Sequence, residues 1–133
     1  MIALLDTHCF LWAAIDPEKL PGKAREAIAD PAHEIQVSTV SFWEISIKFA
    51  LGKLDLTGCA PDDLVVVARK MGLAIVAPSV EEMASFYRLP RLAHKDPFDR
   101  LLIWQCLQCD WTLISRDGAF GEYRELGLKT IWQ

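Results

Sequence analysis

The stretch "MIALLDTHCFLWAA", residues 1–14, opens with an apolar run that shows no polar alternation and ends at Asp6. A short run of this kind suits a β-strand that is buried on both faces, as in a parallel sheet. The residues that follow, "THCFLWAA", suit a helix. The stretch therefore predicts the first strand and helix of an α/β protein, with a carboxylate at the point where the strand ends.

Strand and helix patterns alternate along the rest of the chain. Short apolar or β-branched runs predict strands at 34–40, 73–78, 111–115 and 128–133. Helices are predicted at 21–30, 41–53, 60–72, 79–89 and 96–109, and a short helix or turn at 117–126. This alternation favours right-handed β–α–β units, and hence an open parallel sheet that helices cover on both faces.

Two of the predicted helices begin with acidic residues that have a structural explanation as well as a functional one. Ser41 is the predicted N-cap of one helix, and Glu44 stands at its capping-box position three residues later. Asp96 suits the N-cap of the other, followed by Pro97 and then by Asp99 in the first turn. The sequence pattern is compatible both with helix capping and with a role of these acids in a functional site.

Three acidic residues fall at or just after the ends of predicted strands, namely Asp6, Glu44 and Asp117. Ligands of open parallel sheets bind beyond the carboxyl ends of the strands, so these side chains are expected at one edge. The helix start that carries Asp96 and Asp99 could lie at either edge. As structural alternatives, Asp6 would suit a helix cap and Asp117 a turn.

Four or five carboxylates at one edge would raise one another's pKa values and cost stability unless a cation neutralised them. A ligand set made only of oxygen atoms favours Mg²⁺ or Mn²⁺ over zinc. Such an ion activates water and stabilises charge on a phosphoryl group, which makes a phosphodiester the predicted substrate. The chain has no glycine-rich nucleotide-binding motif and no Gly-x-Ser-x-Gly sequence.

The composition is that of an ordinary globular protein, with 133 residues, 52% apolar content and a net charge of −4. We expect a single domain over residues 1–133 that is soluble and cytoplasmic, because no apolar run approaches membrane-spanning length. The acidic balance provides no overall attraction for nucleic acid. Free thiols are expected at all four cysteines, Cys9, Cys59, Cys106 and Cys109.

The acidic motifs "LLDTH", "SFWEISIK", "HKDPFDRLLI" and "LISRDGAF" together resemble those of PIN-domain proteins, above all the VapC-type toxins of bacterial toxin–antitoxin pairs. The resemblance spans residue 2 to about residue 131. It implies a three-layer α/β/α fold around a central parallel sheet of four to five strands. It also implies a Mg²⁺-dependent ribonuclease, with Mn²⁺ as a substitute, that forms a homodimer and binds a cognate antitoxin.

The resemblance also implies a role for each acid. Asp6 and Asp99 would be the principal metal ligands, directly or through water. Glu44 would orient a metal-bound water, and Asp117 would complete the acidic cluster. Asp96 would either join this cluster or cap its helix.

Substrate contacts are expected from residues around these acids. In the family the hydroxyl that follows the first aspartate, here that of Thr7, commonly lies beside the metal, although it would also suit a helix cap. Ser115 and Arg116 would either contact a ligand or end their strand. A local basic cluster suits RNA phosphates, with a solvated surface or internal ion pairs as the alternative, and consists of Arg88, Arg91, His94, Lys95 and Arg100.

Two other functions fit parts of the pattern. A PIN-like module could bind its partners without turnover. A receiver-like signalling domain also carries acids at the ends of parallel strands, but it requires an acidic pair after the first strand and a lysine near a late one. Asp6 stands alone and "TLISRD" contains no lysine. The aromatic residues near the predicted site suit either the core or an interface with the antitoxin, namely Phe10, Trp12, Phe42, Trp43 and Phe49.

Overall fold

The centre of the molecule is a parallel β-sheet, seen in a computed structural model that describes residues 1–92, 95–116 and 118–132. Five strands in this part of the chain have the spatial order β3-β2-β1-β4-β5, and all neighbours are parallel. The prediction of a parallel sheet with four to five strands is confirmed. The strands are β1 (Ile2–Leu5), β2 (Glu34–Ser38), β3 (Ala74–Val76), β4 (Thr112–Ile114) and β5 (Lys129–Ile131).

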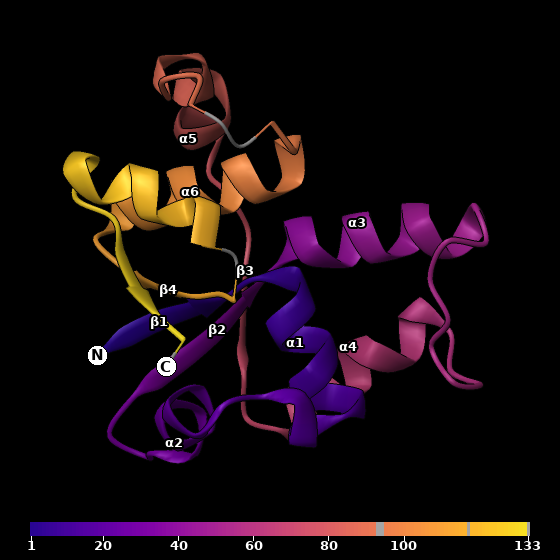
Figure 1. Cartoon of the computed structure of the whole chain (residues 1–133). Coiled ribbons are helices and arrows are strands. Elements are labelled where there is room, and N and C mark those ends of the chain that lie inside the picture. The colour runs from indigo at the N-terminus through magenta and orange to yellow at the C-terminus, as the bar shows by residue number, and fades with distance from the viewer. Residues whose placement is uncertain (93–94, 117, 133) are drawn as a thin grey trace.

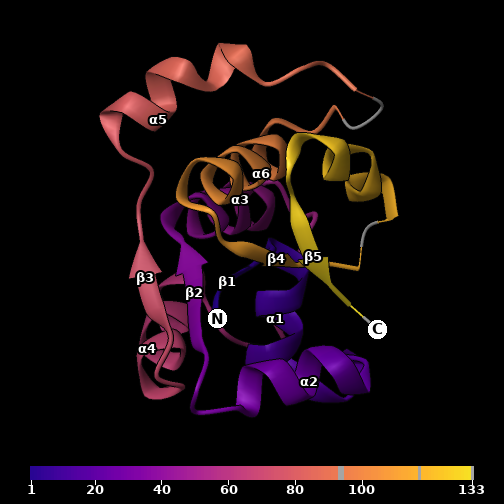
Figure 2. The same cartoon turned by 90° about the vertical axis from the view of Figure 1, so that its left-hand side faces the viewer.

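Helices cover both faces of this sheet and complete three layers (Figures 1 and 2). One face carries α1, α2 and α4, and the other carries α6 and the 3₁₀ segment η3. The helices are α1 (Thr7–Ile15), α2 (Gly22–Ala29), α3 (Thr39–Ala50), α4 (Pro61–Lys70), α5 (Val80–Ser85) and α6 (Pro97–Cys109). The 3₁₀ segments are η1 (Pro17–Lys19), η2 (Phe86–Arg88) and η3 (Gly118–Leu126).

The core has one half on each face of the sheet. Side chains of β1 alternate between them, because Ala3 and Leu5 enter the half under α1, α2 and α4, whereas Leu4 enters the half under α6. All three are fully buried. Burial on both faces explains why the strand has no polar alternation in its sequence.

The direction of α6 decides where its acidic first turn lies. This helix ends at Cys109, and β4 starts at Thr112 after a reversal at Asp110, which has a positive φ of 57°. The helix therefore runs opposite to the strand, so its N-terminus lies at the carboxyl edge of the sheet (Figure 1). Asp96 and Asp99 are thus at the same edge as the end of β1.

The start of α3 differs from the sequence prediction. The helix begins at Thr39, and its N-cap is Ser38, whose Oγ accepts a hydrogen bond from the backbone N–H of Val40 at 3.1 Å. The prediction of Ser41 as the N-cap is wrong, because the β-branched residues after Ser38 resembled strand. Ser41 and Glu44 therefore lie within α3 rather than at its start, and Glu44 is not a capping-box residue. Both side chains are buried.

Two further expectations concern the cysteines and membranes. All four cysteines are free thiols, as predicted, and burial raises the pKa of the Cys9 and Cys106 thiols. Across the described part of the chain, every helix is too short or too polar to cross a lipid bilayer.

Candidate active site

Asp6 is held at the end of β1 by two hydrogen bonds. Its Oδ1 accepts from the backbone N–H of Cys9 at 2.8 Å, so it caps α1, and its Oδ2 accepts from Ser115 Oγ at 2.6 Å. The residue is only 5% exposed. Burial raises the pKa of this carboxyl, although both hydrogen bonds favour its ionised form. Asp6 is both a helix cap and a buried acid whose negative charge is costly.

Glu44 is anchored to the first turn of α1. Its Oε1 accepts a hydrogen bond from Thr7 Oγ1 at 2.7 Å, and Thr7 Oγ1 lies 2.9 Å from Ser41 Oγ. All three side chains are buried, with Glu44 only 2% exposed. Thr7 follows Asp6 directly, so this network holds Glu44 next to the end of β1.

Lys48 stands one helical turn after Glu44 and binds the other carboxylate oxygen, Oε2. Partial burial lowers the pKa of this lysine, but the hydrogen bond and charge of Glu44 outweigh it, together with the charges of Asp96 and Asp99. The net effect is a raised pKa, so the ammonium group is positively charged among these carboxylates. The sequence analysis missed Lys48, although its i,i+4 spacing from Glu44 was a usable signal.

Both aspartates at the start of α6 interact electrostatically with Lys48 on α3. Asp96 is the N-cap, as the helix-start pattern suggested, because its Oδ1 accepts from the backbone N–H of Phe98 at 2.8 Å and of Asp99 at 3.2 Å. Asp99 lies half-buried in the same turn. The rings of Trp43 and Phe98 meet edge to face at a centroid distance of 5.3 Å, which joins the two helices beside the acids.

This arrangement supplies oxygen donors of the kind that Mg²⁺ prefers. Asp6, Glu44, Asp96 and Asp99 share the carboxyl edge, and Lys48 supplies positive charge there. Within residues 1–92, 95–116 and 118–132, no three potential ligand side chains lie close enough together to hold one ion in common. The fourth predicted core acid, Asp117, and the predicted RNA contact His94 fall outside the described residues.

A basic pocket of about 350 Å³ lies at the start of α6 and the loop before it, and is lined by Arg91, Leu92, Lys95 and Arg100. Arg91 and Lys95 are exposed, whereas Arg100 is half-buried and donates from Nη2 to the Leu89 carbonyl at 3.0 Å. Arg100 therefore also anchors the loop before α6. The structure thus brings three of the predicted basic residues together.

Two further predicted basic residues, Arg88 and Arg116, have aromatic partners. The guanidinium of Arg88 lies 5.7 Å from the centroid of the Tyr87 ring, and that of Arg116 lies 5.1 Å from the Trp12 ring. Both arginines are exposed. Arg116 directly follows Ser115, the partner of Asp6, and so lies beside the acids.

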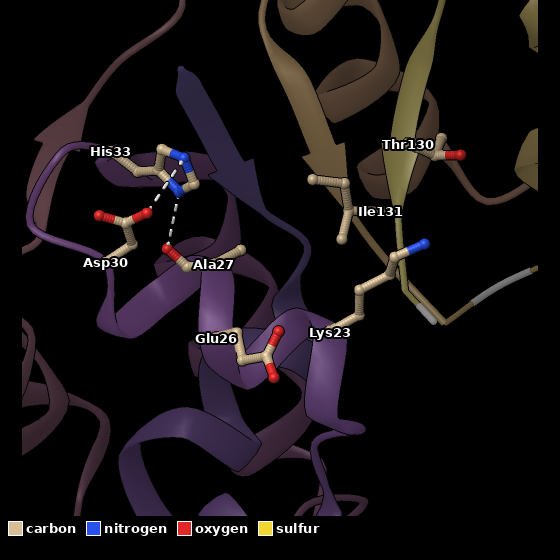
Figure 3. A pocket seen from close by; sticks show the side chains of 7 residues that line it. All are labelled: Lys23, Glu26, Ala27, Asp30, His33, Thr130 and Ile131. Atoms are coloured by element: carbon tan, nitrogen blue, oxygen red, sulfur yellow. Dashed lines mark hydrogen bonds and ion pairs between the residues drawn. The ribbon is translucent and has the colours of Figure 1, made fainter.

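A separate pocket of about 310 Å³ lies between α2, the turn before β2 and β5 (Figure 3). Its His33 Nδ1 lies 3.1 Å from the Ala27 carbonyl, and His33 Nε2 lies 3.7 Å from Asp30 Oδ2. None of the residues predicted for the active site lines this pocket. This pocket is therefore distinct from the candidate active site, which consists of the acids at the carboxyl edge of the sheet.

Removing the Lys48 charge is expected to destabilise the metal-free protein. In a Lys48→Met variant the buried Glu44 carboxylate loses its cation, which costs about 2 kcal/mol of unfolding free energy after allowance for the partial exposure of Lys48. Urea unfolding in EDTA measures this change. Lys53→Met, at an exposed lysine just after α3, is the control and stays within about 0.5 kcal/mol. Equal midpoints for the two variants would contradict a role for Lys48 as counter-ion.

Comparisons with known proteins agree with this architecture. The family model of the PIN domain matches residues 3–126. Ribonuclease VapC22 from Mycobacterium tuberculosis is 27% identical over 129 residues, covering 97% of each protein.

Among solved structures, the fold is similar to VapBC2 from Rickettsia felis bound to a promoter DNA fragment, with a TM-score of 0.67, 16% identity and full coverage of both chains. It is also similar to VapBC-1 from nontypeable Haemophilus influenzae, with a TM-score of 0.64, 16% identity, and coverage of 98% of this chain and 97% of that one. These likenesses confirm the predicted fold. The family model covers nearly the whole chain, which sets aside the receiver-like alternative, and the protein belongs to the PIN domain family.

Proposed function

We propose that the protein is a metal-dependent endoribonuclease and the toxin of a type II toxin–antitoxin pair. The observation that carries the proposal is the group of acids at the carboxyl edge of a PIN-domain sheet, Asp6, Glu44, Asp96 and Asp99. Similarity to a protein named as a ribonuclease supports the same reaction class. The proposal takes the chain as one catalytic domain over residues 1–133.

In this mechanism Asp6 and Asp99 hold Mg²⁺, or Mn²⁺ in its place, with Asp117 and Asp96 as auxiliary acids. The ion would supply charge stabilisation at the phosphoryl group and a lower pKa for water. Ser115 and the Cys9 backbone keep both Asp6 oxygens oriented. These bonds favour the ionised carboxylate, which is the form that binds a cation.

Glu44 orients the attacking water in the proposed reaction, and Thr7 keeps one oxygen of its carboxylate in place. Water attacks phosphorus in line with the 3′-oxygen, the phosphorus–oxygen bond to that 3′-oxygen breaks, and the leaving oxygen takes up a proton. The products carry a 5′-phosphate and a 3′-hydroxyl. Lys48 neutralises part of the acidic charge that would otherwise repel the RNA phosphate.

RNA binding is assigned to the basic pocket and its surroundings. Arg91 and Lys95 are exposed at the pocket and suit phosphate contacts, as does Arg100 in its wall. Exposed Arg88 and Arg116 extend the proposed RNA contacts beyond the pocket, whereas buried Thr7 and Ser115 would act through Glu44 and Asp6. His94, the remaining predicted contact, stays a proposal outside the described residues. The basic residues provide local attraction that a net charge of −4 does not provide overall.

The proposed partners are a cognate antitoxin and a second copy of the chain, and the proposed location is the cytoplasm. Two structures with the same fold are named as VapBC complexes, from Rickettsia felis and Haemophilus influenzae. Their similarity to this chain supports an antitoxin partner here.

Cleavage of RNA by the purified, antitoxin-free protein tests this function. With Mg²⁺ or Mn²⁺ we expect cuts that map to defined nucleotides and leave 5′-phosphates, and in EDTA we expect none. An Asp6→Ala sample prepared in parallel controls for contaminating nucleases. Metal-dependent RNA binding without cuts would instead identify a catalytically silent binding module.

A further inference from the structure

Trp43 is a large aromatic side chain that the core leaves uncovered. It lies on α3 between buried Ser41 and buried Glu44, yet 60% of its surface is exposed. Its indole meets the Phe98 ring at 5.3 Å with an interplanar angle of 77°, the edge-to-face arrangement that aromatic pairs favour. Phe98 is half-buried and packs against the core under α6. The exposed indole is therefore held in place by an anchored ring.

The aromatic pair lies at the junction of α3 and α6, the two helices that carry Glu44 and the aspartates. Trp43 precedes Glu44 on α3, and Phe98 precedes Asp99 on α6. Lys48 on α3 interacts electrostatically both with Glu44 on its own helix and with Asp99 on α6, so it lies at the same junction. A molecule that placed a phosphate at these acids would therefore have its adjoining groups near the junction at which the indole is exposed.

We propose that Trp43 stacks on a base of single-stranded RNA next to the phosphate that is cleaved. This inference rests on the proposed function. The basic residues attract the RNA backbone locally, but the four carboxylates repel it, so an uncharged contact would add affinity there without adding repulsion. Stacking on an exposed aromatic ring supplies such a contact, and it is open to any base because every base has a π-face. A paired base inside a duplex would not present that face, so the preferred substrate is unpaired.

The test measures RNA binding without cleavage. The probe is a short fluorescein-labelled single-stranded RNA of randomised sequence, titrated in EDTA and followed by fluorescence anisotropy. Trp43→Ala is expected to weaken binding roughly tenfold, and Trp43→Phe, which keeps an aromatic face, by no more than about twofold. Phe49→Ala is the matched control on the same helix, since Phe49 is 39% exposed, and it is expected to bind like wild type. Thermal midpoints of all variants confirm folding.

Each outcome separates stacking from the proposed reaction. Wild-type binding by Trp43→Ala overturns the stacking proposal, even where the wild type cleaves RNA with Mg²⁺. Equal weakening in Trp43→Ala and Trp43→Phe also overturns it, because a stacking face survives in phenylalanine. Binding that depends on Trp43 in a protein that never cleaves supports stacking and contradicts the nuclease.

Discussion

An Asp99→Asn variant is expected to cleave RNA at least about a hundredfold more slowly than the wild type, with its fold intact. The substitution keeps the shape of the side chain but removes one of the two charges assigned to the metal. Asp99 is half-buried in the first turn of α6, where losing a negative charge costs only about 0.5 kcal/mol of helix stability. Initial cleavage rates at saturating Mg²⁺ and far-UV circular dichroism measure the two effects separately.

Asp96→Asn is the matched control for this variant. Asparagine caps helices as well as aspartate, so the bonds to the Phe98 and Asp99 backbone are retained while the charge is lost. If Asp96 is chiefly a cap, its variant keeps activity within about tenfold of wild type. Full activity in Asp99→Asn, or a larger loss in Asp96→Asn, would reverse the roles of the two aspartates.

An Asp6→Asn variant is expected to lose the stabilisation that Mg²⁺ gives the wild type. At a Mg²⁺ concentration of about one hundred times the dissociation constant, a single-site ligand raises the unfolding free energy by about 2.7 kcal/mol. The variant lacks the buried carboxylate that would attract the ion, so its thermal midpoint is expected to stay constant with Mg²⁺. A midpoint that rises as in wild type would show that the ion binds elsewhere.

The same variant is expected to be more stable than the wild type when metal is absent. Burial raises the pKa of Asp6 above its ordinary value of 3.8, so folding favours its neutral form. In the wild type, the preference of the folded state for neutral Asp6 stabilises the protein fully at pH values below 3.8. This stabilisation is lost as the pH rises through the raised pKa of the folded state. The advantage of Asp6→Asn in EDTA therefore grows with pH, which urea unfolding across a pH series measures. A constant difference would contradict the raised pKa.

Much of the fold follows from local patterns in the sequence. The apolar run before Asp6 and the lack of polar alternation predicted a strand buried on both faces, which β1 is. The start of α3 was misplaced because Thr39 and Val40 are β-branched, and a helix start is set by the cap hydrogen bond that actually forms. The sheet edge at which α6 begins depends on the direction in which the chain connects one strand to the next, and local sequence patterns do not give that direction.

The candidate site was predictable where acids follow strands, and less so where side chains meet across helices. Lys48 was missed although its i,i+4 spacing from Glu44 was a local signal, whereas its further interaction with Asp96 and Asp99 comes from a different helix. The predicted RNA contact Arg100 also binds the Leu89 carbonyl, a contact between residues 11 apart that no charge pattern reveals. Trp43 is exposed only because of how α3 packs, and its sequence neighbours gave no sign of that.

The bond between Ser115 and Asp6 joins residues that are 109 positions apart in the chain. Proteins are synthesised from the N-terminus, so Asp6 leaves the ribosome long before its hydrogen-bond partner exists. The central strand β1 likewise lacks its neighbour β4 until residue 112 has been made. The candidate site can therefore be completed only after residue 115 has been made, and a shorter nascent chain carries the first acid without the residue that orients it.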